Sequence, residues 1–252
     1  MRPMFVMGNW KMNGSRKTIQ VLIEGLLLRA DTYDNAANVV VFPPAIYIPL
    51  VAKMLENSRI RWGAQTTHAD ESGAYTGELS PSMFADYGCS YVLVGHSERR
   101  SLFNESEECV AKKFHSVKEH GMIPVLCVGE TKLERENGLM VSVLEQQLRA
   151  VHCDGAGDFQ KCVVAYEPVW AIGTGLTATP DEAAEAHACI RDIVTELAPG
   201  DAERLSIVYE GSVNEQTAEA LFSMPDIDGG LVGGASLKAE QFSDIVTCIK
   251  CY

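Results

Sequence analysis

The 252-residue sequence predicts a single (β/α)8 barrel that spans residues 1–252. Short apolar runs recur eight times, segments with a helical hydrophobic period separate them, and no Ser-, Gly- or Pro-rich linker or shift in composition marks a domain boundary. Alternating strands and helices favour a parallel sheet, and about 250 residues is a common size for a closed barrel of this class. A doubly wound open sheet is the less favoured alternative.

The predicted strands are mostly continuous apolar stretches rather than alternating ones. Parallel strands that are covered on both faces have this pattern. In chain order the eight runs are Met4–Met7, Val39–Phe42, Ile60–Trp62, Tyr91–Val94, Ile123–Val128, Cys162–Tyr166, Ser206–Tyr209 and Gly229–Val232.

Helix signals lie between these runs. After Ser15, a candidate N-cap, apolar residues from Ile19 to Ala30 follow the 3.6-residue period. Thr179-Pro180-Asp181-Glu182 is a capping box with proline at the first helical position, and a second periodic segment follows it. Ser80-Pro81 repeats the signal of a cap followed by proline, and Gly121 is typical of a helix end.

Composition and charge limit the partners. The chain is 46% hydrophobic, and its 21 Lys and Arg against 34 Asp and Glu give a formal charge of -13. Nucleic acids and anionic membranes attract clustered Lys and Arg, and the sequence has no basic block, so neither is expected as the main partner. The eight cysteines are too dilute for a disulfide scaffold, and the apolar N-terminal run is too short for a signal peptide. We expect a cytoplasmic protein.

In a barrel of this class the chemistry lies at the carboxyl ends of the strands. Lys11 follows the first run and is the only charge between Pro3 and Ser15. The local residues favour a surface lysine, whereas its place at the carboxyl end of a strand adds support for an anion-binding role. His96 follows the fourth run, where a helix that starts at Ser97 would favour the neutral imidazole. A structural histidine is equally compatible with this segment.

Glu167 ends the sixth run. Partial desolvation at such a position raises the pKa of a carboxyl group and makes it a better base near neutral pH. The next ten residues include Trp170 and Ile172 but no charge, which is typical of a loop that alternates between open and docked states.

Small residues follow the last two runs. Glu210-Gly211-Ser212 comes after the seventh run, and Gly233-Gly234 comes after the eighth. Backbone N–H groups at these two positions form a recurrent phosphate site in this fold. The sequence lacks a phosphate loop, a zinc helix with paired histidines and a dinucleotide fingerprint, so neither a metal nor an organic cofactor is expected.

Five segments together resemble the triosephosphate isomerase family over the whole chain. The matching segments are Gly8-Asn9-Trp10-Lys11, Gly73–Glu78, Val94–Arg100, Tyr166–Gly175 and Leu231–Leu237. The resemblance implies interconversion of dihydroxyacetone phosphate and D-glyceraldehyde 3-phosphate, in glycolysis and gluconeogenesis, without a cofactor. The sequence is therefore expected to encode an isomerase.

The resemblance also implies roles for individual residues. Glu167 would be the base, and His96 the neutral electrophile, an assignment that belongs to the family and is carried over here. Lys11 and Asn9 would face the substrate, and Glu98 would orient the lysine. Backbone N–H groups would hold the phosphate, and they belong to Gly173, Ser212, Gly233 and Gly234.

A closing lid is implied after the sixth strand. Closure would exclude water and protect the enediolate intermediate from losing phosphate. Tyr209 and Ser212 would hold the lid when it is shut. Its residues are Pro168, Val169, Trp170, Ala171, Ile172, Gly173, Thr174, Gly175, Leu176, Thr177 and Ala178.

The long polar segment Gln65–Ser80 is also implied to be functional. In the family it inserts into a neighbouring subunit, where the residue that matches Thr76 approaches the other active site. The resemblance therefore implies a homodimer.

Two positions depart from the family pattern. The family usually has glycine where Glu210 stands, and often lysine where Leu176 stands. We predict that the Glu210 side chain points outward and that activity survives, and that Leu176 alters lid opening more than chemistry. We also expect a positive active-site mouth on an otherwise negative surface.

Two rival functions remain open at this point. The nearer one is another phosphosugar barrel, although those lack this pairing of His96 with Glu167-Pro168-Val169-Trp170. The other is a binding or scaffold protein that kept the barrel and lost activity. The presence of Lys11, His96 and Glu167 argues against a scaffold, whereas Glu210 favours it.

Overall fold

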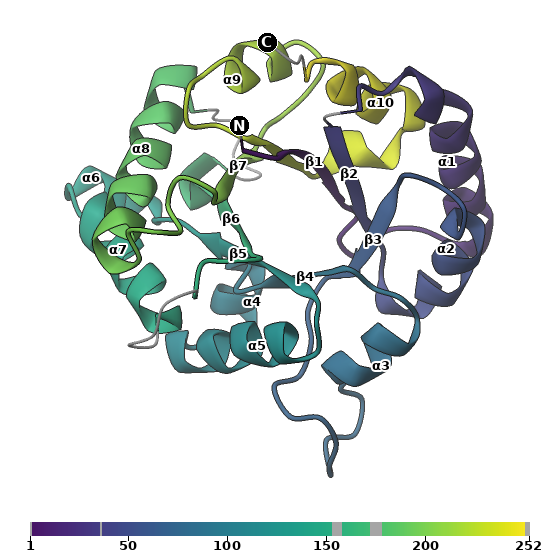
Figure 1. Ribbon diagram of the computed structural model, residues 1–252, viewed down its shortest axis with the longest axis horizontal. Coiled ribbons are helices and arrows are strands. Elements are labelled where there is room, and N and C mark those ends of the chain that lie inside the picture. The colour runs from purple at the N-terminus through teal and green to yellow at the C-terminus, as the bar shows by residue number, and fades with distance from the viewer. Residues whose placement is uncertain (1, 36, 153–157, 172–177, 250–252) are drawn as a thin grey trace.

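The computed structural model describes residues 2–35, 37–152, 158–171 and 178–249. Its strands form a closed barrel in the order β1-β2-β3-β4-β5-β6-β7-β8, and every neighbouring pair is parallel. Helices surround the barrel on its outside (Figure 1). The predicted (β/α)8 fold is confirmed.

The strand positions agree with the apolar runs to within a few residues. The strands are β1 Met4–Asn9, β2 Ala37–Phe42, β3 Arg61–Ala64, β4 Tyr91–Val94, β5 Ile123–Val128, β6 Val163–Tyr166, β7 Ser206–Gly211 and β8 Gly229–Val232. The α-helices are α1 Arg16–Arg29, α2 Ile48–Leu55, α3 Pro81–Asp86, α4 Ser97–Leu102, α5 Glu107–Glu119, α6 Lys132–Glu136, α7 Met140–Val151, α8 Pro180–Leu197, α9 Ala218–Phe222 and α10 Ala239–Thr247.

The predicted helix starts carry the expected caps. Ser15 accepts a hydrogen bond from the Thr18 N–H and begins α1, and Thr179 with Glu182 forms a complete capping box at α8. Each cap satisfies N–H groups that the helix itself leaves without partners. None of the described helices is both long and apolar enough to cross a membrane.

Alternation along the strands divides the apolar side chains between two cores. One set fills the inside of the barrel and includes Met7, Cys127, Ala165 and Val208. The other set, which includes Tyr209, packs between the barrel and its helices. Because successive side chains of a strand point to opposite faces, the residue two positions after an inward side chain also points inward.

Strand register determines which residues meet at the top of the barrel. Tyr166 on β6 is paired with Tyr209 on β7. The next residues along the two strands, Glu167 and Glu210, are therefore neighbours, and each lies two positions after an inward side chain. The fold thus points two carboxyl groups into the same end of the barrel.

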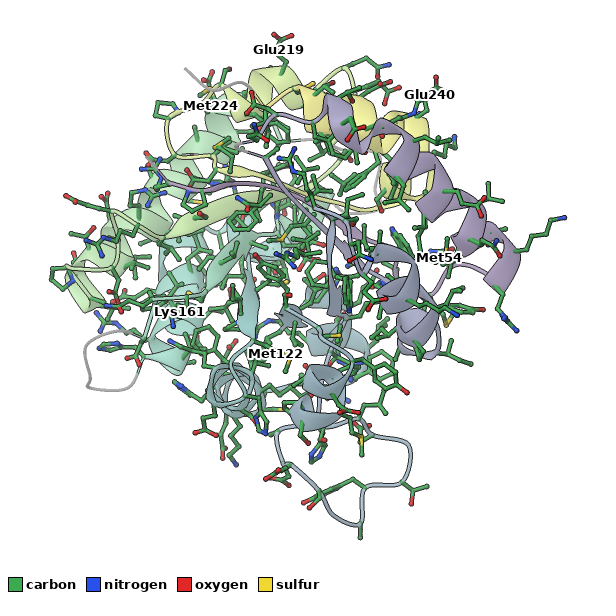
Figure 2. The ribbon with its side chains drawn as sticks, turned by 45° about the vertical axis from the view of Figure 1, so that its right-hand side comes forward. Met54, Met122, Lys161, Glu219, Met224 and Glu240 are labelled. Atoms are coloured by element: carbon green, nitrogen blue, oxygen red, sulfur yellow. The ribbon has the colours of Figure 1, made fainter. Side chains whose placement is uncertain are left out.

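Acidic residues also lie on the outer surface. Figure 2 shows Glu219 on α9 and Glu240 on α10 pointing away from the barrel.

Candidate active site

A cavity of about 510 Å³ opens at the carboxyl ends of the strands. It brings together six of the residues predicted for the site: Asn9, Lys11, Glu98, Ser212, Gly233 and Gly234. The other described lining residues are Asn13, Glu210, Gly211, Val213, Asn214, Ala235 and Leu237. Segments that follow β1, β4, β7 and β8 therefore share one cavity.

Glu167 is almost completely buried at the end of β6, with 1% of its surface exposed. Its Oε2 accepts a hydrogen bond of 2.8 Å from the backbone N–H of Ser97, and its Oε1 accepts one from the Ser97 hydroxyl. Glycine at position 129 allows the backbone of Glu167 to lie this close, since a Cβ atom on residue 129 would be 1.8 Å from the backbone oxygen of Glu167.

The environment of Glu167 suits a base. Burial and the charge of Glu210 raise the pKa of Glu167 to about 7, while His96 and the Ser97 hydrogen bonds oppose the rise. A carboxyl group with this pKa is partly ionised near neutral pH and accepts a proton more readily than an exposed one.

His96 caps the N-terminus of α4, and each of its two ring nitrogens has a polar neighbour. The backbone N–H of Glu98 donates to Nδ1 over 3.1 Å. Nδ1 is then the acceptor, so the neutral ring carries its proton on Nε2. Nε2 lies 3.0 Å from Oε1 of Glu210 and 3.6 Å from Oε1 of Glu167.

Opposing influences act on the charge of His96. Burial lowers the pKa of the imidazole, and the carboxylates of Glu210 and Glu167 raise it by more, so the net direction is upward. However, a second ring proton would sit on Nδ1 and point at the N–H of Glu98, placing two donors head to head. We take this contact to be decisive and assign the neutral ring.

Lys11 reaches the cavity from the end of β1. Its backbone has a φ of 49°, a left-handed conformation that is uncommon outside glycine and asparagine. Its ammonium group contacts Oε1 of Glu98 at 2.7 Å. Burial lowers the pKa of Lys11, but the hydrogen bond with Glu98 and the charge of Glu210 raise it overall, so the ammonium form is kept.

The prediction that the Glu210 side chain points outward is wrong. Glu210 is 5% exposed, and its Oε1 contacts His96 inside the barrel. The physical reason is strand alternation, because Val208 faces the barrel interior and Glu210 lies two residues later on β7. Backbone strain does not arise, since Glu210 is not among the described residues with positive φ.

The expectation of a positive mouth is also wrong. The charged side chains that line the described part of the cavity are Lys11, Glu98 and Glu210, which is one cation against two carboxylates. Gly233 and Gly234 leave the opposite wall open, because a Cβ atom on Gly233 would meet only the Lys11 side chain, at 4.0 Å, and one on Gly234 would meet nothing within 4 Å. The backbone at Gly233 and Gly234 therefore leaves space for a ligand.

His96, Glu167 and Glu210 form the described group of possible metal ligands, with one ligand atom from each lying within 4.8 Å of the others. A metal would need the lone pair of Nε2, and the proton on that nitrogen occupies it. Moving the proton to Nδ1 would set it against the Glu98 N–H. The ring orientation therefore does not suit a cation at this position.

The predicted lid lies only partly within the described residues. Val169–Ala171 forms one 3₁₀ turn, and Nε1 of Trp170 donates to the buried carboxylate of Glu130 over 2.9 Å. Ala178 is buried at the other end. Ile172, Gly173, Thr174, Gly175, Leu176 and Thr177 lie outside the described residues.

The loop at 65–80 extends away from the barrel between β3 and α3 (Figure 1). It has internal order, since the rings of His68 and Tyr75 lie 4.1 Å apart and the N–H of His68 donates to the oxygen of Leu79. Thr76 is exposed near its tip.

A family model described as triosephosphate isomerase matches residues 4–249 of the chain. The chain belongs to the triosephosphate isomerase family. The triosephosphate isomerase of Legionella pneumophila subsp. pneumophila strain Philadelphia 1 is 58% identical to it over 252 residues, covering 99% of this chain and 100% of that protein. The triosephosphate isomerase of Nitrosococcus oceani is 49% identical over 246 residues, covering 97% of this chain and 98% of that protein.

The sequence analysis did not identify two residues that hydrogen-bond to predicted site residues. Ser97 holds both oxygens of Glu167, and Glu130 is fully buried beneath Trp170. Ser97 could have been suggested by its place at a helix N-terminus directly after His96, where a free N–H is expected. Glu130 gives no comparable signal, because its burial depends on Tyr166 of β6 and on Trp170, which donate to it from more than 30 residues along the chain.

Proposed function

We propose that the chain interconverts dihydroxyacetone phosphate and D-glyceraldehyde 3-phosphate without a cofactor. The observation that carries this proposal is the pairing of a buried carboxyl group of raised pKa, Glu167, with Nε2 of His96 at 3.6 Å, beside a cavity that contains Lys11. A base and a hydrogen-bond donor on one face of a small cavity suit proton transfer next to a carbonyl group.

The proposed steps follow from these groups. Glu167 removes a proton from the carbon that bears the hydroxyl group and returns it to the former carbonyl carbon. The hydroxyl proton moves to the former carbonyl oxygen through Nε2 of His96, which gives its proton to one oxygen and takes one from the other. The Nε2–H of His96 and the ammonium group of Lys11 stabilise the negative charge that develops on oxygen. Glu98 and Asn9 orient Lys11, since Glu98 accepts from its ammonium group and Oδ1 of Asn9 accepts from its backbone N–H at 3.1 Å.

Phosphate binding is proposed for the backbone N–H groups of Ser212, Gly233 and Gly234, with Gly173 of the lid joining them. The open surface at Gly233 and Gly234 supports this assignment. The phosphate anchors the substrate so that its reacting carbons remain beside Glu167. Each proposed step is a proton transfer, so the mechanism requires neither a metal nor an organic cofactor.

A coupled isomerase assay tests the function in both directions. We expect turnover of each triose phosphate by the purified chain, and competitive inhibition by inorganic phosphate. Phosphate binding without turnover by the wild-type chain and by variants at Glu210 would instead support a scaffold protein. Turnover of a larger phosphosugar, with none of triose phosphates, would support another phosphosugar barrel.

The acid limb of the activity profile is expected near neutral pH. Only the ionised form of Glu167 accepts a proton, so kcat/KM should fall about tenfold per pH unit below pH 7. The groups that face Glu167 are Glu210 from β7, His96 and Ser97 after β4, and Lys11 after β1.

The matched comparison for this profile is Glu210→Gly. Removing the neighbouring negative charge should move the acid limb to lower pH. Ionisation of the substrate phosphate affects both proteins equally and cancels in the comparison. Superimposable profiles would show that Glu210 does not control the ionisation of the base.

We propose that the protein is a homodimer that uses the loop at 65–80. Large apolar side chains are exposed around a second cavity of about 210 Å³, which is lined by Met12, Gln65, His96 and Phe103 among others. Met12 is 96% exposed and Phe103 is 63% exposed. Contiguous exposed apolar groups mark interaction surfaces, and the exposed loop tip of a second copy has suitable chemistry to cover them.

Sedimentation measures this association. We expect a species of twice the 27.5 kDa chain mass, and its dissociation when Thr76 is replaced by arginine. Glu240→Arg is the matched control, because it adds positive charge on the outer helix α10. A wild-type chain that sediments at 27.5 kDa at micromolar concentration would contradict the proposal.

We also propose a cytoplasmic location. Thiols support it: Cys89, Cys109, Cys127, Cys162 and Cys189 are unbridged in the described part of the chain. Burial raises the pKa of Cys89 and of Cys162 to about 12, which keeps both as thiols.

A further inference from the structure

We infer that Glu210 is a positioning residue that competes with the substrate's carbonyl oxygen for one hydrogen-bond donor, Nε2–H of His96. This inference rests on the proposed isomerase function. In the free enzyme the Nε2–H of His96 would then be hydrogen-bonded to Glu210. Productive binding of a substrate would have to break this hydrogen bond.

The competition follows from the number of protons on the ring. A neutral imidazole has one N–H donor, and the Glu98 N–H on Nδ1 assigns it to Nε2. Oε1 of Glu210 lies 3.0 Å from Nε2, which is the distance of a formed hydrogen bond. The donor that would polarise a substrate oxygen is therefore already in use.

The surroundings of Glu210 make this contact persistent. The carboxyl group is buried, and apart from His96 the described residues offer it no donor stronger than the thiol of Cys127, which is a weak one. Because a buried carboxylate is costly without partners, Glu210 gains more from the His96 proton than an exposed side chain would. Glu167 is its neighbour in register and adds repulsion rather than an alternative partner.

A carboxylate on Nε2–H also changes the chemistry of the ring. The negative charge stabilises the proton on the nitrogen, which makes the imidazole a weaker electrophile. In addition, Glu210 lines the cavity that would receive a phosphate dianion. Two effects have to be separated: direct competition for the donor, and general repulsion of an anion.

Two substitutions and two probes separate these effects. Glu210→Gln removes the charge and keeps a neutral acceptor of nearly the same shape, whereas Glu210→Gly removes both charge and acceptor. Inorganic phosphate at the proposed N–H groups of Ser212, Gly233 and Gly234 is expected to sense charge alone, because His96 is not among the residues that line this cavity. 2-Phosphoglycolate carries both a phosphate and a carboxylate that stands in for the enediolate oxygens, so it senses charge and donor together.

The expected kinetic result is a graded increase. A hydrogen bond to a charged partner is strong enough that its removal should raise kcat/KM by about 10-fold or more in Glu210→Gly, with a smaller rise in Glu210→Gln. Affinity for 2-phosphoglycolate should rise in the same order. Affinity for inorganic phosphate should rise equally in the two variants, because each loses the same charge.

A spectroscopic measurement reports on the donor directly. In protein with ¹⁵N-labelled histidine, the Nε2–H proton of His96 should resonate at low field and exchange slowly while Glu210 accepts from it. It should move upfield in Glu210→Gly, and addition of 2-phosphoglycolate should shift it in both proteins. Glu240→Gln, on the exposed surface of α10, should leave the resonance and kcat/KM unchanged.

The inference is overturned if Glu210→Gly leaves kcat/KM, 2-phosphoglycolate affinity and the His96 resonance as they are in the wild type. It is also overturned if both variants gain equally with both probes, since charge alone would then explain the effect. Glu210→Gln provides these comparisons if the glycine variant does not fold. Absence of turnover in every protein, together with a His96 resonance that responds as expected, would refute the isomerase function and leave the contact itself established.

Discussion

Replacement of Glu167 by glutamine is expected to lower kcat by about 100- to 10,000-fold, the usual contribution of a positioned general base. Glutamine has nearly the shape of glutamate and can still accept hydrogen bonds from Ser97, so the fold and the cavity should be preserved. It cannot take up a proton from carbon. KM should change much less, because the base acts mainly in the transition state.

Two measurements check this expectation. The coupled assay gives kcat and KM, and deuterium uptake from solvent into recovered substrate reports the proton removal itself, so both rates should fall together. Glu185→Gln is the matched control, as its side chain is 67% exposed on α8. A comparable loss in the control, or deuterium uptake that continues at the wild-type rate in Glu167→Gln, would exclude Glu167 as the base.

The sequence predicted the barrel because its signals are local. Apolar runs, the cap at Ser15 and the capping box at Thr179 depend on near neighbours, and each is found where the pattern indicates. The ends of β1 and β7 lie two residues beyond the predicted runs, at Asn9 and Gly211. These extensions are polar or glycine residues that apolar runs do not include.

The error at Glu210 has a different origin. A carboxylate near a bound phosphate is repelled by it, which favours an outward Glu210, but Val208 two residues earlier on β7 is an apolar residue of the barrel interior. Alternation is geometric and prevails, because turning Glu210 outward would also turn Tyr209 inward. The side-chain contacts of the site were beyond the sequence, since they depend on register between β6 and β7 and on the turn that follows β4.

The charge of the whole molecule and that of its cavity now agree in sign. A chain of formal charge -13 places Glu98 and Glu210 against Lys11 at the mouth of its cavity. Capture of a phosphate dianion would therefore depend on the uncovered backbone at Gly233 and Gly234 and on Lys11 rather than on the long-range field. Removal of Glu210 should improve both the local charge and the availability of His96.

The largest loss of stability is expected from Asp228→Ala, at the opposite end of the barrel. Asp228 is buried directly before β8, and Nε of Arg2 lies 2.7 Å from its Oδ1 while Nη2 of Arg191 lies 3.1 Å from its Oδ2. Oδ2 also accepts from the backbone N–H of Ile207 on β7 over 2.9 Å. One carboxylate therefore connects the N-terminus, α8 and the β7–β8 pair.

Removing that carboxylate leaves three donors without their acceptor. Loss of one partner from a buried charged network costs about 3–5 kcal/mol of unfolding free energy. In a chain of this size each kcal/mol lowers Tm by about 2–4 °C, so a decrease of roughly 6–20 °C is expected. Urea unfolding followed by tryptophan fluorescence and by circular dichroism measures the free energy.

Asp228→Asn separates charge from hydrogen bonding at this position. Asparagine keeps one acceptor oxygen for Arg2 or for Ile207. The unfolding free energy of Asp228→Asn should therefore lie between those of the wild type and Asp228→Ala. Glu240→Ala should change stability by less than about 0.5 kcal/mol, since Glu240 is exposed and forms a surface pair with Arg29. KM of the folded variants should match that of the wild type, because Asp228 lies at the amino end of β8 and the cavity lies at the carboxyl end. A raised KM with unchanged stability would refute this structural role.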